Sequence, residues 1–531
     1  MIAWDGWVTM LPPLVAIGVA LALRRVVVAL ASGAVVAAVV AREGALLGGG
    51  GLRGEVSCLW GAEAPAGVAC ALWGYLATAL FNLDNLSITT FTCLVAGTVG
   101  IMGASGATSR LVAGVERLAR GPRGAMLASW AAGFLVFFDD YANCMVVGRS
   151  MGPVCDRQGV SRAKLAYIVD CTAAPLASVA VIGTWVGYEV GLIEDALRRL
   201  GRDGAGFATF VSSLPYAFYA VAALALVGAV ASSGRDIGPM LAEERRARAE
   251  HRDTGAGHAA PSGARGSAWS AALPVVVMVG TTLLAMVVSG VSASGRPLWD
   301  LAVFELLAEA DALRAMLLGS AVGFALAAVQ GRRIGLRGVG RGAVSGLHGL
   351  GEALVVLYLA WTLGDAINDT AAQDFLTGSL RGNLSPALLP AVVFGVGAAT
   401  AFATGSAFGT MGLLVPLVVP LSFGLDGGAL LAPSIAAVLG GACLGDHASP
   451  ISDTTVLSAA GCEVDVVTHV RTQLPYVLIA GAGALLLGFL PAGFGVSPWV
   501  LLPLIVLAMA LTLRLLGRTV DAERQRLLSH R

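Results

Sequence analysis

Long apolar segments alternate with short polar breaks along almost the whole chain, and this alternation constrains the fold more than any other feature. Hydrophobic residues make up 56% of the 531 residues and charged residues 13%, whereas soluble domains carry about 25% charged residues. A helix that crosses a membrane needs about 20 predominantly apolar residues. The chain therefore predicts an all-α polytopic membrane protein with about 11–13 transmembrane segments.

The apolar segments differ in length, and several are too short for a full crossing. A short apolar segment beside a polar break favours a broken helix or a re-entrant hairpin over a complete span. The segments lie near Val8–Leu23, Val26–Ala41, Val68–Phe81, Ile88–Ala104, Ala125–Phe138, Ala163–Val186, Phe207–Ala231, Ala268–Val291, Ala312–Ala328, Ala343–Leu363, Pro386–Phe402, Gly409–Leu421, Ala429–Leu444, Leu474–Leu490 and Trp499–Leu515.

One hydrophilic linker, residues 232–267, divides the chain into an N-terminal membrane repeat, 1–231, and a C-terminal membrane repeat, 268–516. The sequence EERRARAEHRD lies at its centre, and the tail, 517–531, is also rich in Arg. Because cytoplasmic segments carry an excess of basic residues, we expect the linker and the C-terminus to be cytoplasmic. The dominance of Arg over Lys suggests a bacterial genome, so the inner (plasma) membrane is the expected location.

Charge and cysteine content exclude several classes of function. The formal net charge is zero, which argues against a nucleic-acid partner. The eight cysteines form no CxxC pair and show no metal-ligand spacing, and several lie in apolar segments, where Cys behaves as a small hydrophobe. We therefore expect no obligatory disulfide, no zinc site and no cofactor.

The two halves of the chain resemble each other weakly. Phe138 aligns with Phe402 at a constant offset, which also superposes the polar breaks that follow them. After an insertion, Asp170–Pro175 aligns with Gly445–Pro450. Interrupted hydrophobic segments at corresponding positions of two halves are typical of secondary transporters with inverted-topology repeats and a site near the midplane. Chance similarity between helices rich in Ala, Gly and Val is the alternative.

Four polar breaks interrupt the apolar segments, and the fourth is the richest in polar groups. An ionised Asp near the bilayer centre costs about 2.5–3.5 kcal/mol, so the aspartates are expected to have a function. Pro450 removes a backbone donor and disfavours helix at the residue before it. A polar loop at the membrane surface is the alternative. The candidate ion- or proton-binding residues are Asp139, Asp140 and Asn143 in the first break, Asp170, Thr172 and Ser178 in the second, Thr404 and Ser406 in the third, and Asp446, Ser449, Ser452, Asp453 and Thr454 in the fourth.

These breaks supply mainly oxygen ligands, which hard cations such as sodium prefer. Protons compete for the same carboxylates, because burial favours the neutral carboxyl form and a bound cation favours the charged form. A carboxylate that holds either a proton or a sodium ion makes an exchanger. We assign this role to Asp140, Asp446 and Asp453, together with Asp170; the sequence leaves open which of them carries the exchanged proton.

Other polar residues near the breaks have less specific roles. Arg149 is a candidate to balance one carboxylate or to hold a substrate, and His447 is a candidate to tune the response to pH. Glu189 lies near the end of an apolar segment, where a structural role is favoured over a place on the ion pathway.

Two long blocks resemble the NhaC-type sodium/proton antiporters: FFDDYANCMVVGRSMGPVCDRQGVSRAKLAYIVDCTAAPLAS and GDHASPISDTTVLSAAGCEVDVVTHVRTQLPY. The resemblance extends from about Pro12 to Leu490. It implies a cation:proton exchanger of the ion-transporter superfamily, with inverted repeats, hairpins and a mobile transport domain beside a scaffold. A homodimer is expected on the same ground. Members of the family also exchange organic anions such as malate and lactate with coupling ions, and some relatives handle amino acids.

The sequence departs from the family pattern in two breaks. The second break usually carries Pro and Ser before Thr-Trp, and here Ala180–Trp185 reads AVIGTW. The third usually reads like TGTSWGTM, and here Thr404–Met411 reads TGSAFGTM. Two potential hydroxyl ligands are therefore missing, at Gly183 and Ala407, so the number of sodium ions bound is left open.

The sequence as a whole predicts a sodium/proton antiporter that works by alternating access and is not an enzyme. The first alternative is a sodium- or proton-coupled carrier of a small organic acid or amino acid on the same fold. The second is an intramembrane aspartyl protease. Such proteases share a GxGD motif, whereas the nearest matches, Thr362–Asp365 and Cys443–Asp446, lack the first Gly.

Overall fold

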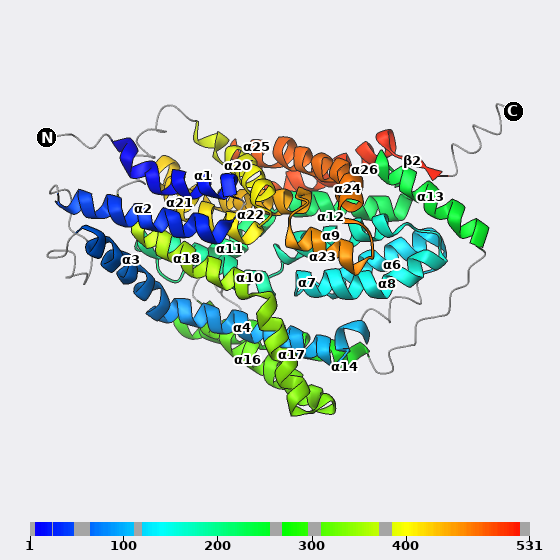
Figure 1. Ribbon diagram of the computed structural model, residues 1–531, viewed down its shortest axis with the longest axis horizontal. Helices are drawn as coiled ribbons and strands as arrows, with labels where there is room; N and C mark the ends of the chain where they lie inside the picture. Colours follow the sequence, from blue (N-terminus) through cyan, green and yellow to red (C-terminus); the bar gives the residue numbers. More distant parts are fainter. Residues whose placement is uncertain are drawn as a thin grey trace.

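The computed structural model describes residues 6–23, 25–46, 64–110, 119–254, 268–295, 310–370 and 385–520. Over these residues the structure is almost entirely helical (Figure 1), which confirms the all-α prediction. The described strands are β1 (Arg235–Asp236) and β2 (Arg518–Thr519), which form one antiparallel pair. This pair joins the end of the first half to the end of the second.

The first half begins with one short helix and three longer ones and continues with helices that are interrupted at polar positions. Its helices are η1 (Gly6–Met10), α1 (Leu11–Leu23), α2 (Val26–Leu46), α3 (Ala64–Phe81), α4 (Leu83–Ala104), α6 (Gly121–Leu135), α7 (Asp140–Ala142), the π-helical turn η3 (Asn143–Val147), α8 (Gly148–Arg157), α9 (Arg162–Ala177), α10 (Thr184–Arg199), α11 (Gly206–Ser213), η4 (Leu214–Tyr216) and α12 (Phe218–Ser233). The described part of the hydrophilic linker contains α13 (Pro239–Thr254).

The second half repeats this order, with long helices first and interrupted ones later. Its helices are α14 (Ala268–Ser294), α16 (Ala312–Gln330), η6 (Gly331–Ile334), α17 (Gly335–Gly349), α18 (Gly351–Asn368), η7 (Pro386–Leu388), α20 (Leu389–Thr404), α21 (Ala407–Asp426), α22 (Leu431–Ala448), α23 (Asp453–Gly461), α24 (Val466–Gly483), the π-helical turn η8 (Ala484–Phe489), α25 (Leu490–Gly493) and α26 (Pro498–Leu516).

Within the described residues, seven helices are long and apolar enough to cross a membrane, or eight if the bent pair Gly206–Tyr216 and Phe218–Ser233 forms one span. Four shorter apolar helices accompany them. The chain is thus a multi-pass membrane protein. Of the helices that flank the four polar breaks, α20 (within Pro386–Thr404) and α21 (Ala407–Asp426) are among these described spans, and the others are too short or too polar to be counted.

Apolar side chains cover the outside of the molecule as well as its interior. In Pro498–Leu516, only 22% of the residues in the apolar window are buried. Trp499, Val500, Leu507 and Leu515 of this helix are all exposed. A helix that is apolar on its exposed face suits a lipid environment, because lipid tails replace the protein core as its surroundings.

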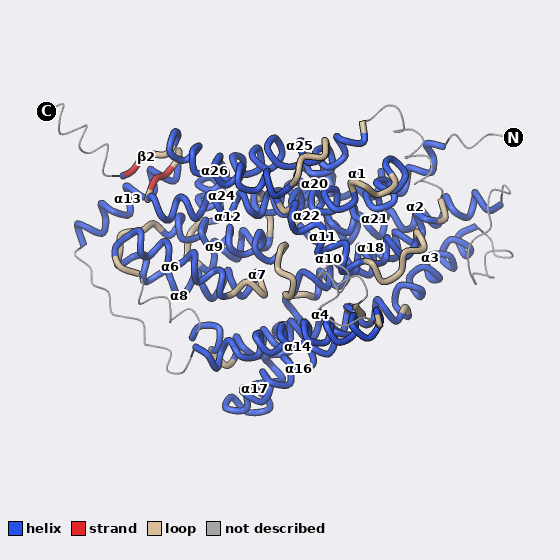
Figure 2. The backbone as a smooth tube through the Cα atoms, turned by 180° about the vertical axis from the view of Figure 1, so that it is seen from behind, coloured by secondary structure: helices blue, strands red, loops and turns tan. Residues whose placement is uncertain are grey.

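The helices form two groups that lie one above the other in Figure 1, and Figure 2 shows the same arrangement from behind. One group contains α4, α14, α16 and α17, which pack on one another. The backbones of α4 and α17 approach closely at glycines: a Cβ on Gly100 would lie 2.1 Å from the carbonyl oxygen of Gly342. Small residues permit such contact between membrane helices.

The other group contains the interrupted helices, and α20 and α22 are in especially close contact within it. A Cβ on Gly441 would lie 2.5 Å from the carbonyl oxygen of Phe394, and one on Gly445 would lie 2.2 Å from that of Ala398. Any side chain at these positions would push the two helices apart. This packing holds the C-terminal end of α22, where Asp446 is located, firmly against α20.

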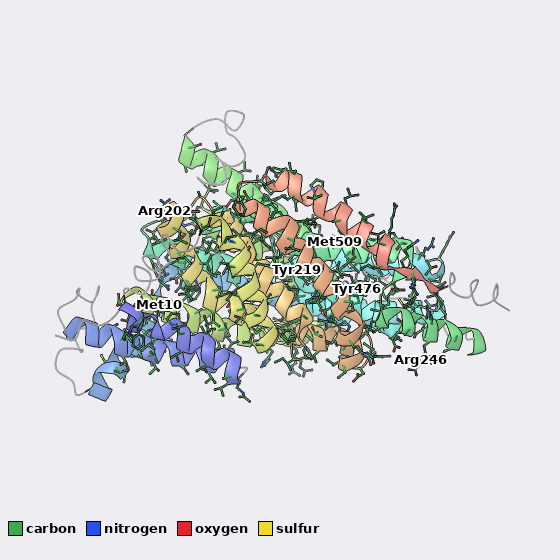
Figure 3. The ribbon with its side chains drawn as sticks, turned by 90° about the horizontal axis from the view of Figure 1, so that it is seen from above. Met10, Arg202, Tyr219, Arg246, Tyr476 and Met509 are labelled. Carbon is green, nitrogen blue, oxygen red and sulfur yellow. The ribbon has the colours of Figure 1, made fainter. Side chains whose placement is uncertain are left out.

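The hydrophilic linker is tied to this group by buried charges. Lys164 of α9 forms an ion pair with Asp236 of β1, and its Nζ lies 3.8 Å from Oε2 of Glu244 on α13. All three side chains are buried. Figure 3 shows that Arg246, two residues further along α13, lies at one end of the molecule. The charge cluster thus fastens the first part of α13 to the start of α9.

The expectation that the chain has no disulfide is wrong, because Cys70 of α3 is disulfide-bonded. A disulfide forms where two Cβ atoms come within about 3.5–4.5 Å in space, which spacing along the sequence does not reveal. Six other cysteines are free, at positions 93, 144, 155, 171, 443 and 462.

Candidate ion-binding site

All four polar breaks are places where one helix ends and another begins. The first, residues 136–139, lies between α6 and α7, and the second, 178–183, lies between α9 and α10. The third, 405–406, separates α20 from α21, and the fourth, 449–452, separates α22 from α23. Each half therefore contains two interrupted helices, α6/α7 and α9/α10 in the first half and α20/α21 and α22/α23 in the second.

Two of the breaks carry the residues that cap the following helices. Asp139 Oδ1 accepts a hydrogen bond from the amide of Ala142 (2.6 Å), and Ser406 Oγ accepts one from the amide of Gly409 (3.1 Å). Asp and Ser are preferred N-cap residues, since their side chains satisfy amides that have no partner inside the helix. A π-helical turn follows at η3, a feature that is frequent at functional sites.

The breaks lie against one another in pairs. The amide of Thr184 in the second break donates to the carbonyl oxygen of Phe138 in the first (3.0 Å). In the third break, a Cβ on Gly405 would lie 2.7 Å from the side chain of Ile451 in the fourth. The two pairs are joined because Tyr141, which follows the first break, donates its phenolic hydrogen to Asp453, which follows the fourth.

Asp446 lies at the centre of a shell of oxygen atoms. Ser452 Oγ donates to Asp446 Oδ1 (2.8 Å), and Thr454 Oγ1 donates to Asp446 Oδ2 (2.8 Å). The hydroxyl of Thr455 donates to the main-chain carbonyl of Asp446 (3.4 Å). All four side chains are buried. The sequence predicted the convergence of Asp446, Ser452 and Thr454, and the structure brings them together.

Asp453 is exposed to a cleft, whereas Asp140 is buried behind it. The cleft has a volume of about 470 Å³ and is lined by polar groups from three of the breaks, Tyr141, Ser406 and Asp453, together with Arg25 and several apolar side chains. Asp140 Oδ2 is buried and has no hydrogen-bond partner among the described residues. The carboxylates of Asp139 and Asp453 repel that of Asp140. A proton or a cation would relieve this repulsion.

Asn143 connects the first break to α9. Its Nδ2 donates to the carbonyl oxygens of Gly133 (3.0 Å) and Thr172 (2.7 Å), while its buried Oδ1 has no partner among the described residues. The lone pairs of this amide oxygen are therefore available to a cation.

The remaining predicted hydroxyls bond to nearby backbone. Thr172 Oγ1 donates to Ile168, Ser178 Oγ to Pro175 and Thr404 Oγ1 to Thr400. Ser449 Oγ accepts from the amide of Ile451 (3.5 Å). These hydroxyls lie at or next to the breaks, but the structure does not bring them onto the oxygens of Asp446.

A second polar cluster surrounds Asp170, which is fully buried. Asp170 Oδ2 accepts hydrogen bonds from His469 Nε2 (3.2 Å) and Gln473 Nε2 (3.0 Å), and His447 Nε2 lies 3.7 Å away. Tyr219 Oη shares a hydrogen bond with His447 Nδ1 (2.9 Å). Tyr219 lies in the interior of the molecule in Figure 3. Asp170 is thus held by an amide and by imidazole groups. It forms a cluster separate from the oxygen shell of Asp446.

Sequence reasoning missed Tyr141, Tyr219, His469 and Gln473. His469 and Gln473 lie four residues apart on α24, so they share one helix face. That spacing is visible in VDVVTHVRTQLPY and was the one sequence signal that could have indicated a shared polar site for these two residues. Arg149 lies elsewhere: it is exposed on α8 and forms no ion pair within the described part of the chain.

The donor set suits a sodium ion better than a transition metal. Across the described residues, no group of three or more His, Cys, Asp or Glu side chains is placed to hold a metal ion. The oxygens near Asp446 come instead from one carboxylate and several hydroxyls, which are ligands for a hard, weakly bound cation.

Broken helices whose breaks meet around buried carboxylates are the architecture of a secondary transporter. The model of the Na+/H+ antiporter family matches residues 177–494, more than half of the chain, so the protein belongs to the Na+/H+ antiporter family. This is the NhaC-type family whose resemblance the sequence showed. The membership places the chain with carriers rather than with enzymes.

One relative and two solved structures are similar to this chain. A protein of Haemophilus influenzae described as uncharacterized is 29% identical over 418 residues, which cover 78% of this chain and 80% of that protein. The YdaH transporter of Alcanivorax borkumensis, described as having an unusual topology, has a TM-score of 0.55 at 17% identity, covering 83% of this chain and 91% of that one. MtrF of Neisseria gonorrhoeae, described with a class of antimetabolite efflux pumps, has a TM-score of 0.49 at 19% identity, with coverages of 81% and 85%. The similarity to YdaH supports the fold.

Proposed function

We propose that the protein exchanges sodium for protons across the membrane and that Asp446, Asp453 and Asp140 hold the two ions alternately. The observation that carries the proposal is the arrangement of these three carboxylates. Asp446 is buried in a shell of hydroxyls, Asp453 opens to the cleft, and Asp140 has a buried oxygen without a partner. Family membership supports sodium as a transported ion.

The shell of Asp446 is able to serve both ions. When no cation is bound, Ser452 and Thr454 point their hydrogens at the carboxylate. A hydroxyl is donor and acceptor at once, so both hydroxyls can rotate and offer lone pairs to a sodium ion beside Asp446. A proton on Asp446 removes the negative charge and with it most of the attraction for sodium. Binding of one ion therefore excludes the other.

Asp453 and Tyr141 form the entrance to this site. Asp453 is exposed to the cleft and one residue from Thr454, so an ion that enters the cleft meets it before it meets Asp446. Tyr141 donates to Asp453 and stabilises its charged form. An arriving sodium ion replaces the tyrosine hydrogen as the partner of the carboxylate.

The proposed architecture follows the two series of interrupted helices. We propose that α6–α10 and α20–α23 are inverted repeats and that alternating access moves this group against the group of α4, α14, α16 and α17. The linker and the C-terminus are proposed to be cytoplasmic, in a bacterial inner membrane, with two copies of the chain forming a homodimer. The proposed N-terminal repeat ends at residue 231, the linker at 267 and the C-terminal repeat at 516.

Sodium-driven proton movement in proteoliposomes, read with an internal pH dye, tests the proposal. Wild type is expected to move protons when sodium is added, and Asp453→Asn is expected not to. Asp465→Asn is a matched control, because Asp465 caps α24 at the surface and Asn caps equally well. If sodium, lithium and potassium all fail to move protons through wild type, cation exchange is wrong.

The size of the cleft favours one further candidate, a coupled carrier of a small organic acid or amino acid. A volume of about 470 Å³ exceeds the space of a sodium ion, and Arg25 supplies a cation that suits a carboxylate. In this candidate function, Arg25 and not Arg149 would hold the carboxylate of the substrate. Stabilisation of the purified protein against heat by organic acids, but not by sodium, would favour this candidate.

A further inference from the structure

Glu189 is a buried carboxylate for which the ion site described above has no role. It lies on α10, five residues after the helix begins at the second break. Its side chain is fully buried, and neither Oε1 nor Oε2 has a hydrogen-bond partner. Among the residues that the structure describes, no other carboxylate has both oxygens buried and unpartnered.

A second acidic residue on the same helix shows what a structural carboxylate looks like here. Asp195 is also buried, but it forms ion pairs with Arg198 and Arg199. Nothing comparable compensates Glu189. An isolated ionised carboxylate in a low-dielectric interior is far too costly to persist, so such a group takes up a proton instead. In the present conformation Glu189 is therefore the neutral acid.

The surroundings of Glu189 connect it to the ion site without direct contact. Trp185, one turn earlier on α10, lies next to Asp140. Cys443 of α22, three residues before Asp446, is near enough for the charge of Glu189 to act on it. Among the described residues of α4, α9, α11, α18 and α21, the helices packed on α10, no charged group acts on Glu189, and Cys443 of α22 is a titratable group on which Glu189 acts.

We infer that Glu189 is a proton-binding site of the transport cycle, separate from the carboxylates that bind the cation. It holds a proton in the closed interior seen here. When the group that contains α10 moves against α4, which packs on α10, Glu189 meets water or a polar group and releases that proton. An ionisable residue buried without a protein partner in a membrane protein is a candidate functional site, and a proton is the partner that this carboxyl group lacks. The transport test of this inference rests on the proposed sodium/proton exchange. The infrared test of proton binding by Glu189 does not.

Infrared spectroscopy of the purified full-length protein tests whether Glu189 binds and releases a proton. The difference between wild type and Glu189→Gln is expected to contain the carbonyl band of a protonated carboxyl group at acidic pH, and the band is expected to disappear at alkaline pH. A band that is absent at every pH, or one that persists unchanged at alkaline pH, overturns the inference. Should Glu189→Gln fail to fold, Glu189→Asp replaces it, because it shifts the same band.

Transport assays then test whether the proton takes part in the cycle. Glu189→Gln imitates a permanently protonated residue and is expected to lose most of the sodium-driven proton movement. Glu189→Asp is expected to keep it with a shifted pH profile. The control Glu250→Gln, at an exposed position on α13, is expected to behave as wild type. If Glu189→Gln moves protons with the wild-type pH profile, Glu189 is only a packing residue. If wild type itself does not respond to sodium, the proposed function fails while the infrared result still decides on Glu189.

Discussion

Two clusters of buried charge lie in the same group of helices, and they are compensated in opposite ways. In the linker cluster, Lys164 supplies a fixed cation to Asp236 and Glu244. In the ion site, Asp140, Asp446 and Asp453 come together with Tyr141, and none of them is paired with a buried cationic side chain among the described residues. Both clusters remove carboxylates from water, but only the first contains its own countercharge.

The difference separates structure from function. A buried carboxylate with a fixed cation is settled in one state, and the arrangement holds two segments together. A buried carboxylate without one depends on a mobile ion, so its state changes when that ion arrives or leaves. The only lysine of the chain, Lys164, belongs to the linker cluster. In the proposed account, sodium ions and protons balance the carboxylates of the ion site. Four predictions test this contrast.

The largest expected effect is that of Lys164→Met. Removal of the cation leaves Asp236 and Glu244 buried without a countercharge, which costs about 3–5 kcal/mol for a broken buried pair. The variant is therefore expected to unfold at a much lower temperature than wild type, or to fail to accumulate. Thermal unfolding of the purified protein measures this. A variant as stable as wild type would show that the linker cluster is not a structural clamp.

Asp446→Asn, in contrast to Lys164→Met, is expected to abolish transport with little loss of stability. The amide still offers an oxygen and an NH2 group to Ser452 and Thr454, so stability is expected to change by no more than about 1.5 kcal/mol. Transport is expected to be lost, because a neutral amide binds neither ion. Sodium-driven proton movement and thermal unfolding of the same preparation measure both properties. Loss of stability together with transport would place Asp446 with the structural charges.

The hydroxyls of the shell are expected to have an intermediate effect. Ser452→Ala or Thr454→Val removes one oxygen near Asp446 but leaves the carboxylate, and loss of such a partner typically lowers metal affinity about 10–100-fold. The sodium concentration for half-maximal transport is expected to rise accordingly, with little change in the maximal rate. Ser232→Ala, at an exposed position, is the control. An unchanged sodium dependence in both variants would exclude the shell as the sodium site.

The smallest expected effect concerns the pH dependence of stability. Burial raises the pKa of Asp236 above its ordinary value, although Lys164 acts in the opposite direction. The native state thus holds this proton more tightly than the unfolded state, so the stability gained is fully present below the unfolded pKa of about 3.9. It is lost as pH rises through the raised native pKa. The unfolding temperature should fall less with rising pH in Asp236→Asn than in wild type. Equal slopes in the two proteins would contradict the assignment of this pH effect to Asp236.

The positions of the breaks could be predicted from the sequence because they depend on local chemistry. Pro450, the glycines around Ser406 and the N-cap residue Asp139 all act on neighbouring backbone. The role of Asp446 and Asp453 was predictable for a similar reason, since hydroxyls and carboxylates in one short stretch of an apolar chain point to an ion site. The structure brings Asp446 together with Ser452 and Thr454 and places Asp453 at the cleft, while their role in ion binding stays a proposal.

The partners of these residues could not be predicted, because they come from distant helices. His469 and Gln473 reach Asp170 only through the packing of α24 on α9, and Tyr141 reaches Asp453 only because the first and fourth breaks meet. The linker cluster and the disulfide of Cys70 likewise depend on contacts in space. Periodicity shows which face of a helix is polar, but it does not show which helix that face meets.

Simultaneous measurement of sodium binding and proton release by the purified protein in weakly buffered detergent solution tests the central claim most directly. If the same carboxylates hold either ion, sodium releases protons from wild type, and Asp446→Asn neither binds sodium tightly nor releases protons. The control Asp465→Asn should behave as wild type. Sodium that binds to wild type without releasing protons would contradict the account, because the two ions would then occupy independent sites.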